Sequence, residues 1–285
     1  MMLDFLQISK AAEFLNLAHP LLVKEEATNG LLLGRTLHLS KTPHEDLMSS
    51  YFLVQKDGVP VLAGIQTPPY NLILSTAEEE QASLYLFDCT LQKKRRFPGV
   101  IGPRPICLPF AQNYTQAYGL DFKIDMQQLV YQLDEVLPAT RQEEGSLRLA
   151  EEEDLPMLTQ WMKAFVEEAM RQVESEEKAK MAAERKIDRS EIYLWEVNGQ
   201  VVSMAGIARP TYNGIAVNYV FTPKVFRKRG YAEACVRALS TLMLQNGFQF
   251  CTLFTDELYP TSNAIYKRIG YRQVASFYNI NFVEG

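Results

Sequence analysis

The sequence has little of several features that would assign a chain to a narrow class. Four cysteines among 285 residues are too few for a small disulfide scaffold, and no apolar run approaches the ~18–20 residues of a membrane span. The 29 Lys and Arg do not outnumber the 34 Asp and Glu, so the net charge of −5 offers no basic surface for nucleic acid. The segment Met1–Ala12 lacks the basic head and apolar core of a signal peptide. We therefore expect a cytoplasmic protein without nucleic-acid or membrane partners.

Cysteine and histidine are too sparse to predict a metal centre. The cysteines have no metal-ligand spacing and sit in apolar surroundings, so we expect buried free thiols and no metal. The histidines, His19, His38 and His44, all lie in the first half of the chain. A catalytic base in the second half must therefore be a carboxylate, or a water held by one.

The sequence does contain an internal repeat. Residues 63–73 and 205–215 share seven of eleven residues at a constant offset of 142. Upstream of each, two β-rich runs flank Asp57-Gly58 or Asn198-Gly199, dipeptides typical of type I′ hairpins because both central residues need positive φ. Duplication explains both matches, and two unrelated β-meanders with shared turn chemistry are the alternative. We predict domains at 1–140 and 146–285, joined by the polar stretch 139–145.

The second half predicts a mixed sheet with helices on its faces. Gly247 is positioned as the left-handed cap of one helix, and Gly270 is expected to end the last one. The expected order is β-α-α-β-β-β-α-β-α-β, an α/β fold of the α+β mixed-sheet type. Strands are expected at 147–150, 192–197, 201–207, 215–221, 250–255 and 271–282, and helices after Asp154 and at 174–189, 230–246 and 262–269. The helix after Asp154 is expected because its apolar residues follow helical spacing: Leu155, Leu158, Met162, Phe165, Val166 and Ala169.

One connection between a strand and a helix is suited to bind phosphate. The strand at 218–222 passes through Pro223 into Arg227-Lys-Arg-Gly-Tyr-Ala232 and then directly into a helix. Gly230 and Ala232 let a ligand approach the backbone closely. The first amides of the helix lack partners and lie beside the positive end of its dipole, and three cations add charge. The spacing is not that of a Walker loop or a dinucleotide fingerprint.

Val-Phe-Thr-Pro at 220–223, followed by Arg-x-x-Gly-x-Ala at 227–232, resembles the acetyl-CoA signature of the GNAT superfamily of N-acetyltransferases. A second element agrees with it. Asn263, Tyr266 and Gly270-Tyr271 resemble the family's segment with Asn, a Tyr three residues on, and Gly-Phe/Tyr closing a short helix. The resemblance covers roughly 147–282 directly. Together with the repeat, it implies two GNAT-like domains in tandem, of which the first is degenerate.

The resemblance implies how acetyl-CoA, the acyl donor, would bind. The pantetheine arm would lie where the strand at 215–222 parts from that at 250–255, and the pyrophosphate on the amides of 229–232. Tyr266 would donate a proton to the departing thiolate, since a phenol with an ordinary pKa of ~10 stays protonated at neutral pH. The expected donor contacts are Val220, Phe221, Thr222, Arg227, Lys228, Arg229, Gly230, Tyr231, Ala232, Asn263 and Tyr266.

The sequence leaves the base that deprotonates the acceptor open. Glu196, Glu191 and Asp256 are candidates, and Glu196 is the working assignment. Many relatives have a carboxylate on the strand before the phosphate loop, whereas this chain has Asn218. An amide positions water but does not usefully accept a proton. A preorganised site needs only proximity and a water relay.

The first half shares the hairpin but not the cofactor signature. Acidic Glu78–Glu80 follows the equivalent strand, and Gly99–Pro103, after the basic run Lys93–Arg96, is a candidate relic of a phosphate loop. No helix is expected to start there, because Pro103, Pro105 and Pro109 interrupt the following residues. We interpret this half as a degenerate GNAT-like domain that packs against the catalytic one and shapes the acceptor pocket.

The leading hypothesis is an N-acetyltransferase that moves an acetyl group from acetyl-CoA to a primary amine in a ternary complex. The acceptor can be a small metabolite, an amino acid, an amino sugar or a peptide terminus, and a covering domain favours a small molecule. A longer acyl donor is also open. The alternative is a catalytically silent CoA-binding sensor or regulatory module, which Asn218 supports. A pure interaction protein would require the phosphate loop to be accidental.

Overall fold

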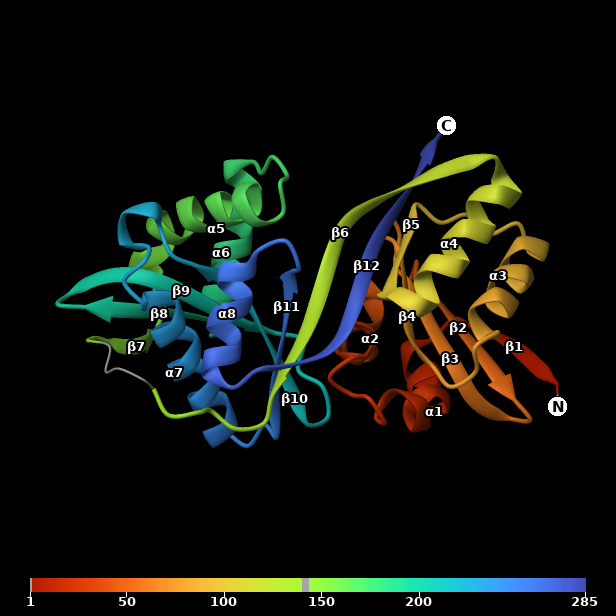
Figure 1. Ribbon diagram of the computed structural model, residues 1–285, viewed down its shortest axis with the longest axis horizontal. Helices are drawn as coiled ribbons and strands as arrows, with labels where there is room; N and C mark the ends of the chain where they lie inside the picture. The colour runs from red at the N-terminus through yellow and green to blue at the C-terminus, as the bar shows by residue number, and fades with distance from the viewer. Residues whose placement is uncertain (1, 140–143) are drawn as a thin grey trace. The chain divides into compact units, whose positions relative to one another are not determined.

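The computed structural model describes residues 2–139 and 144–285. Apart from short 3-10 turns, the two halves of the sequence have the same order of elements, β-α-α-β-β-β-α-β-α-β (Figure 1). The order predicted for the second half is therefore found in both, and the predicted mixed α/β fold is confirmed. Residues 140–143 of the predicted linker lie outside the described residues.

The elements of the first half alternate between sheet and covering helices. They are β1 (Leu3–Ile8), α1 (Ala11–Leu22), α2 (Gly30–Lys41), η1 (Pro43–Glu45), β2 (Ser50–Lys56), β3 (Val59–Gln66), β4 (Leu72–Ala77), α3 (Ala82–Gln92), β5 (Gly99–Pro103), α4 (Arg104–Tyr118) and β6 (Leu120–Leu133).

The second half repeats this order. Its elements are β7 (Ser146–Leu149), η2 (Glu152–Asp154), α5 (Leu155–Ala169), α6 (Glu176–Asp188), β8 (Ile192–Val197), β9 (Gln200–Ala208), β10 (Gly214–Phe221), η3 (Lys224–Phe226), α7 (Tyr231–Gln245), β11 (Phe250–Asp256), α8 (Pro260–Ile269) and β12 (Arg272–Glu284).

The two predicted hairpins form at equivalent places. Asp57 and Gly58, with φ of 52° and 81°, join β2 to β3. Asn198 and Gly199, with φ of 49° and 76°, join β8 to β9. Positive φ at both central residues is the type I′ geometry that the dipeptides predict. Each strand pair also has a register shift near its turn, so the repeat in the sequence is a repeat in the structure.

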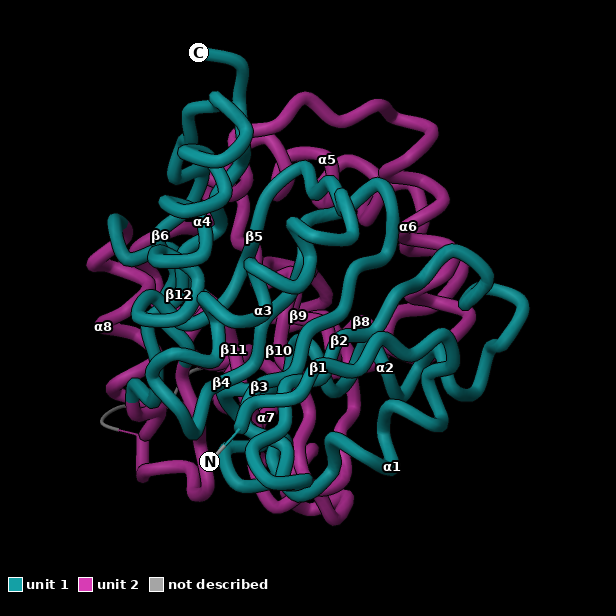
Figure 2. The backbone as a smooth tube through the Cα atoms, turned by 90° about the vertical axis from the view of Figure 1, so that its right-hand side faces the viewer, with its two compact units in different colours: residues 1–130, 255–258, 273–285 teal, residues 131–254, 259–272 magenta. Residues whose placement is uncertain are grey.

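The chain forms two compact units that do not follow the sequence halves (Figure 2). Unit 1 contains residues 1–130, 255–258 and 273–285, and unit 2 contains 131–254 and 259–272. Within unit 1 the strand order is β1-β2-β3-β4-β5-β12-β6, and within unit 2 it is β11-β10-β9-β8-β7. A division into domains at 1–140 and 146–285 stays a prediction.

The last strand corrects one expectation from the sequence. The strand predicted at 271–282 was expected to complete the second half, but β12 pairs antiparallel with β5 of unit 1, from Phe277↔Pro103 to Asn281↔Gly99. Asn71 holds it there, because its Nδ2 donates to Asn279 Oδ1 and Asn281 Oδ1, both at 2.9 Å. The pairing is close, since a Cβ on Gly99 would lie 2.1 Å from the carbonyl oxygen of Ile280.

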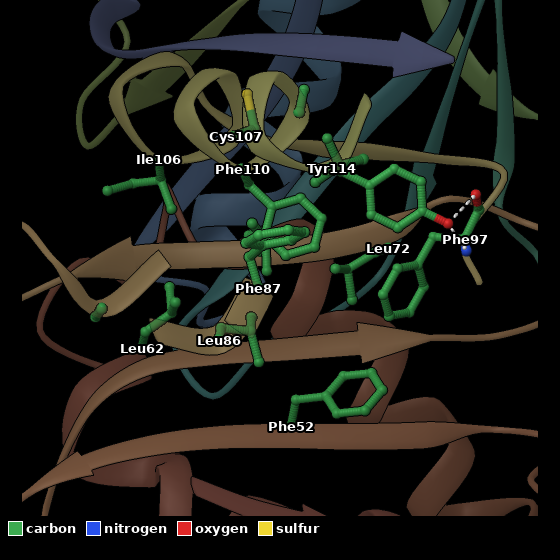
Figure 3. Packing of buried hydrophobic residues seen from close by; sticks show 14 of the residues in the cluster. Phe52, Leu62, Leu72, Leu86, Phe87, Phe97, Ile106, Cys107, Phe110 and Tyr114 are labelled. Carbon is green, nitrogen blue, oxygen red and sulfur yellow. Dashed lines mark hydrogen bonds between the residues drawn. The ribbon is translucent and has the colours of Figure 1, made fainter. Parts of the chain in front are cut away.

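An aromatic cluster forms much of the core of unit 1 (Figure 3). Phe97 lies 5.9 Å from Phe52 and 6.1 Å from Phe110, measured between ring centroids. The hydroxyl of Tyr114, on α4, accepts a hydrogen bond from the Phe97 amide at 2.8 Å. The ring of Tyr114 stacks on Phe282 of β12 at 4.2 Å, so the last strand contributes to this core as well as to the sheet.

The core of unit 2 follows the helical periodicity read from the sequence. Leu158 and Met162 of α5 are buried against Ile192 and Leu194 of β8 and Met204 of β9. Burying side chains of this size stabilises a fold by about 1.5–3 kcal/mol each. A search of the described residues for a helix with the length and apolarity of a bilayer span found none.

Candidate active site

Strands β10 and β11 part at the end that leads to the basic loop, as the family resemblance implies. Among the described residues their parallel ladder pairs Gly214, Ile215 and Ala216 with the first three residues of β11. Against β9, β10 then has a β-bulge between Asn218 and Phe221. Beyond Ala216, the edge of β10 is therefore left to pair with an extended ligand.

The connection from β10 to α7 presents the amides of a helix N-terminus. Lys228 and Gly230 have φ of 64° and 91°, and α7 begins at Tyr231 with Gly230 as its N-cap residue. No side chain of the described residues caps this end. The amides of the first turn thus lack intrahelical partners and lie at the positive end of the helix dipole. This geometry is suited to bind an anion.

The three cations of the loop have different roles. Arg227 holds the loop in shape, because its Nε donates to the Thr222 carbonyl at 2.8 Å and its Nη2 to Glu168 Oε2 at 2.6 Å. Lys228 and Arg229 are exposed and form no ion pair within the described chain. They are therefore the two side chains that remain available to an anion, a distinction that the sequence did not reveal.

Helix α8 buries Tyr266 in unit 2. Tyr266 is 8% exposed, and its ring packs on Tyr271 at 5.9 Å. Burial raises the pKa of Tyr266 to about 12, so its hydroxyl keeps a proton at neutral pH. Asn263 is buried one turn earlier on the same helix, and the helix ends at Gly270 as predicted, with a left-handed φ of 119°.

Tyr131 is a residue of this region that the sequence did not reveal. It comes from the end of β6, in the first half of the sequence, and belongs to unit 2. Its ring lies 6.3 Å from that of Tyr266, and its buried hydroxyl has no hydrogen-bond partner in the described chain. No local pattern predicts this position, because the contact depends on tertiary pairing.

The candidate bases are all engaged in polar contacts. Glu196 accepts from Arg148 Nε at 2.8 Å, and Arg148 also binds Asp154. Glu191 accepts from Lys186 Nζ at 2.9 Å. Asp256 accepts from the amide of Leu258 and belongs to unit 1. These contacts are structural, and the assignment of Glu196 as the base stays a prediction.

Asn218 differs from these carboxylates because its acceptor atom lacks a partner. It lies opposite Gly206 of β9, and its Oδ1 is buried without a hydrogen bond in the described chain. A Cβ on Gly206 would come within 2.9 Å of this oxygen, so the glycine makes room for the amide. An unsatisfied buried acceptor costs about 1–3 kcal/mol, which a bound water or ligand would relieve.

The equivalent connection in unit 1, between β4 and α3, has the opposite charge. It contains Glu78–Glu80. Glu78 pairs with Lys24 at 3.2 Å and Glu79 with Lys56 at 2.5 Å. Carboxylates before a helix N-terminus take the favourable position that a phosphate would otherwise occupy. The repeat thus preserves the fold of this connection and reverses its electrostatics.

The prediction that Gly99–Pro103 is a relic of a phosphate loop is wrong. This segment is β5, and α4 begins directly after it at Arg104. The prolines do not prevent the helix, because Pro103 is its N-cap residue and Pro105 lies in the first turn, where a proline removes no intrahelical hydrogen bond. Pro109 lies inside α4.

Comparison with known families matches the part of the chain that contains these features. The model of the family described as acetyltransferase (GNAT) matches residues 156–271, which include β10, the basic loop, α7 and α8. No curated protein matches the chain.

Solved structures are similar to the chain over nearly its whole length. An acetyltransferase from the GNAT family of Colwellia psychrerythraea is 13% identical, with a TM-score of 0.55, and 99% of this chain and 100% of that one are covered. A GCN5-related N-acetyltransferase from Sphaerobacter thermophilus is 15% identical, with a TM-score of 0.63 and coverage of 99% and 96%. A Drosophila protein is 15% identical, with a TM-score of 0.67 and coverage of 99% and 98%. At these identities the likeness shows the fold, and it extends over both halves.

Proposed function

We propose that this chain, whose residues 156–271 match the model of the acetyltransferase (GNAT) family, is an N-acetyltransferase that uses acetyl-CoA. The acetyl group passes directly to a primary amine of a small molecule in a ternary complex. The observation that carries this proposal is the uncapped N-terminus of α7, with Lys228 and Arg229 beside it, at the end of the strand that parts from β11.

The donor would bind along β10 and the loop that follows. The amides of Arg229, Gly230, Tyr231 and Ala232 take the pyrophosphate, assisted by the exposed ammonium of Lys228. The pantetheine arm pairs as an added strand with Val220, Phe221 and Thr222. Two contacts fix this end of β10: Ser203 Oγ donates to the Phe221 carbonyl at 3.1 Å, and Arg227 binds the Thr222 carbonyl. Asn263 hydrogen-bonds the arm near the thioester.

The transfer itself needs one proton donor and one proton acceptor. The amine nitrogen attacks the thioester carbonyl carbon, a C–N bond forms, and the C–S bond breaks. The Tyr266 hydroxyl gives its proton to the departing thiolate and regains one from solvent. Its buried, protonated state supports this role.

A water held by Asn218 is the proposed route for the amine proton. The buried, unpartnered Oδ1 of Asn218 accepts a hydrogen bond from this water, which passes the proton on. Glu196, the working assignment from the sequence, is held by Arg148, so it would act through such a water rather than by direct contact.

The second candidate is a catalytically silent CoA-binding module. The observation that favours it is that the candidate carboxylates Glu191 and Glu196 are engaged with Lys186 and Arg148, while β10 offers an amide. Both candidates share the donor site, so they differ in turnover and not in affinity.

Calorimetric titration with acetyl-CoA at two ionic strengths tests the donor site. One site per chain, with an affinity that falls as salt rises, is the expected result. A folded protein that does not bind acetyl-CoA would overturn the proposal. Thioester consumption with a panel of primary amines then separates the two candidates, because a silent module binds acetyl-CoA without amine-dependent release of CoA.

A further inference from the structure

Lys186 and Glu191 form an ion pair next to β9. Lys186 of α6 is 5% exposed, and its Nζ donates to Glu191 Oε2 at 2.9 Å and to the Ile207 carbonyl. Burial lowers the pKa of Lys186, and the contact with Glu191 opposes this effect. The carboxylate of Glu191 is therefore committed to the ammonium beside it.

Arg209, just beyond the end of β9, is a cation without such a partner. Its φ is 47°, its Nε atom is buried, and its guanidinium makes no hydrogen bond or ion pair within the described chain. Burial lowers its pKa, and its charge also disfavours protonation of Lys186. A buried guanidinium nitrogen without a hydrogen-bond partner is costly, so it requires an explanation. An anion from outside the chain would supply the missing partner.

The position of Arg209 relates it to the donor site. Its neighbour Ala208 pairs with Ala216, the residue at which the β10–β11 ladder ends. Asn218 follows two residues later on the same face of β10, about 7 Å along the strand. The region therefore offers an unpaired cation and, further along, an unpaired hydrogen-bond acceptor. A molecule with a carboxylate and an amine complements both groups.

We propose that Arg209 binds a carboxylate of the acceptor, so that the acceptor is an amino acid. Its amino group lies toward Asn218, directly or through the water described above. This inference rests on the proposed acetyltransferase function and specifies its substrate class. The first repeat has Thr67 at the position of Arg209, so the guanidinium is a feature of the second repeat alone.

The test compares each standard amino acid with its own carboxamide, which keeps the amine and removes the charge. With the full chain and saturating acetyl-CoA, we expect the accepted amino acid to exceed its carboxamide by about 10- to 150-fold in kcat/KM, the range for a hydrogen bond to a charged group. Arg209→Gln should remove this preference by raising KM for the amino acid, while kcat/KM for the carboxamide changes little. Arg209→Lys should retain part of it.

Arg189→Gln is the matched control, because Arg189 is an exposed arginine of the same unit, at the C-terminal end of α6. Arg189→Gln should leave kcat/KM unchanged for both the amino acid and its carboxamide. Equal efficiency of amino acids and carboxamides in the unmodified protein, or an unchanged preference in Arg209→Gln, would overturn the inference. Acetylation only of amines that lack a carboxylate would overturn the inference and leave the proposed function intact. Failure to bind acetyl-CoA would instead overturn the proposed function.

Thermal unfolding of the ligand-free variants gives a second measurement. If the partner of Arg209 is a ligand, Arg209→Gln removes a guanidinium whose buried Nε has no partner in the ligand-free protein, and the melting temperature stays the same or rises. A fall of several degrees would show that Arg209 is a structural residue and would contradict the proposal.

Discussion

Replacing Tyr266 with Phe separates a catalytic role of its hydroxyl from a packing role. The ring lies 6.3 Å from Tyr131 and 5.9 Å from Tyr271, and these contacts do not need the hydroxyl, so Phe preserves them. Loss of a general acid lowers a rate by about 10²–10⁴-fold. We expect kcat to fall within this range, while the Kd for acetyl-CoA and the free energy of unfolding change little.

Tyr271→Phe is the matched control in the same cluster. The Tyr271 hydroxyl forms a buried hydrogen bond of 2.8 Å with Ser240 Oγ, so its removal should cost about 1–3 kcal/mol of unfolding free energy and leave kcat unchanged. The assays are release of the CoA thiol at saturating substrates and unfolding in urea. An unchanged kcat in Tyr266→Phe would refute the reasoning. A loss of kcat in Tyr131→Phe alone would assign the proton donor to Tyr131 instead.

The remaining predictions concern charge, strand docking and alkaline stability. The double substitution Lys228→Gln and Arg229→Gln should weaken acetyl-CoA binding in calorimetry and make the Kd depend less on salt concentration. An unchanged salt dependence of the Kd would contradict the assignment of the loop. Asn71→Ala should cost about 1–3 kcal/mol in urea unfolding, because it removes the contacts with β12; full stability would contradict their importance. The pKa of Tyr266 is raised to about 12, so its contribution to stability should be lost as pH rises from about 10 to 12, and Tyr266→Phe should lessen that loss.

Local sequence patterns predicted much of the second half. Asn198-Gly199 requires positive φ at both residues, which only a narrow set of turns provides, and the hairpin forms there. Gly247 and Gly270 have φ of 99° and 119° at the ends of their helices. The apolar spacing of α5 placed Leu158 and Met162 in the core. These features depend on a few adjacent residues, so the sequence contains the information they need.

The features that the sequence did not predict depend on tertiary contacts. The sequence gives no reason to distinguish the three cations of 227–229, yet the structure does, because Arg227 pairs with Glu168. Arg209 belongs to no recognisable motif, and only its buried Nε atom without a hydrogen-bond partner distinguishes it. Pro105 and Pro109 led to the expectation that no helix forms after β5. The helix α4 nevertheless forms, because it buries Phe110 and Tyr114 in the core of unit 1.

The placement of β12 leads to a prediction about the first half alone. Phe277 and Ile280 are 1% and 0% exposed, so deleting β12 removes burial worth about 3–6 kcal/mol, while whole domains are stable by only about 5–15 kcal/mol. It also leaves the edge of β5 unpaired and uncovers the ring of Tyr114.

We therefore expect a fragment of residues 1–140 to lack a cooperative unfolding transition, although it is one of the two domains predicted from the sequence. A synthetic peptide of residues 272–285 should bind it and restore the transition, because the peptide supplies the strand and the acceptors for Asn71. A peptide with Asn279→Ala and Asn281→Ala is the matched control and should bind more weakly. A fragment that unfolds cooperatively without the peptide would show that β12 is dispensable for unit 1.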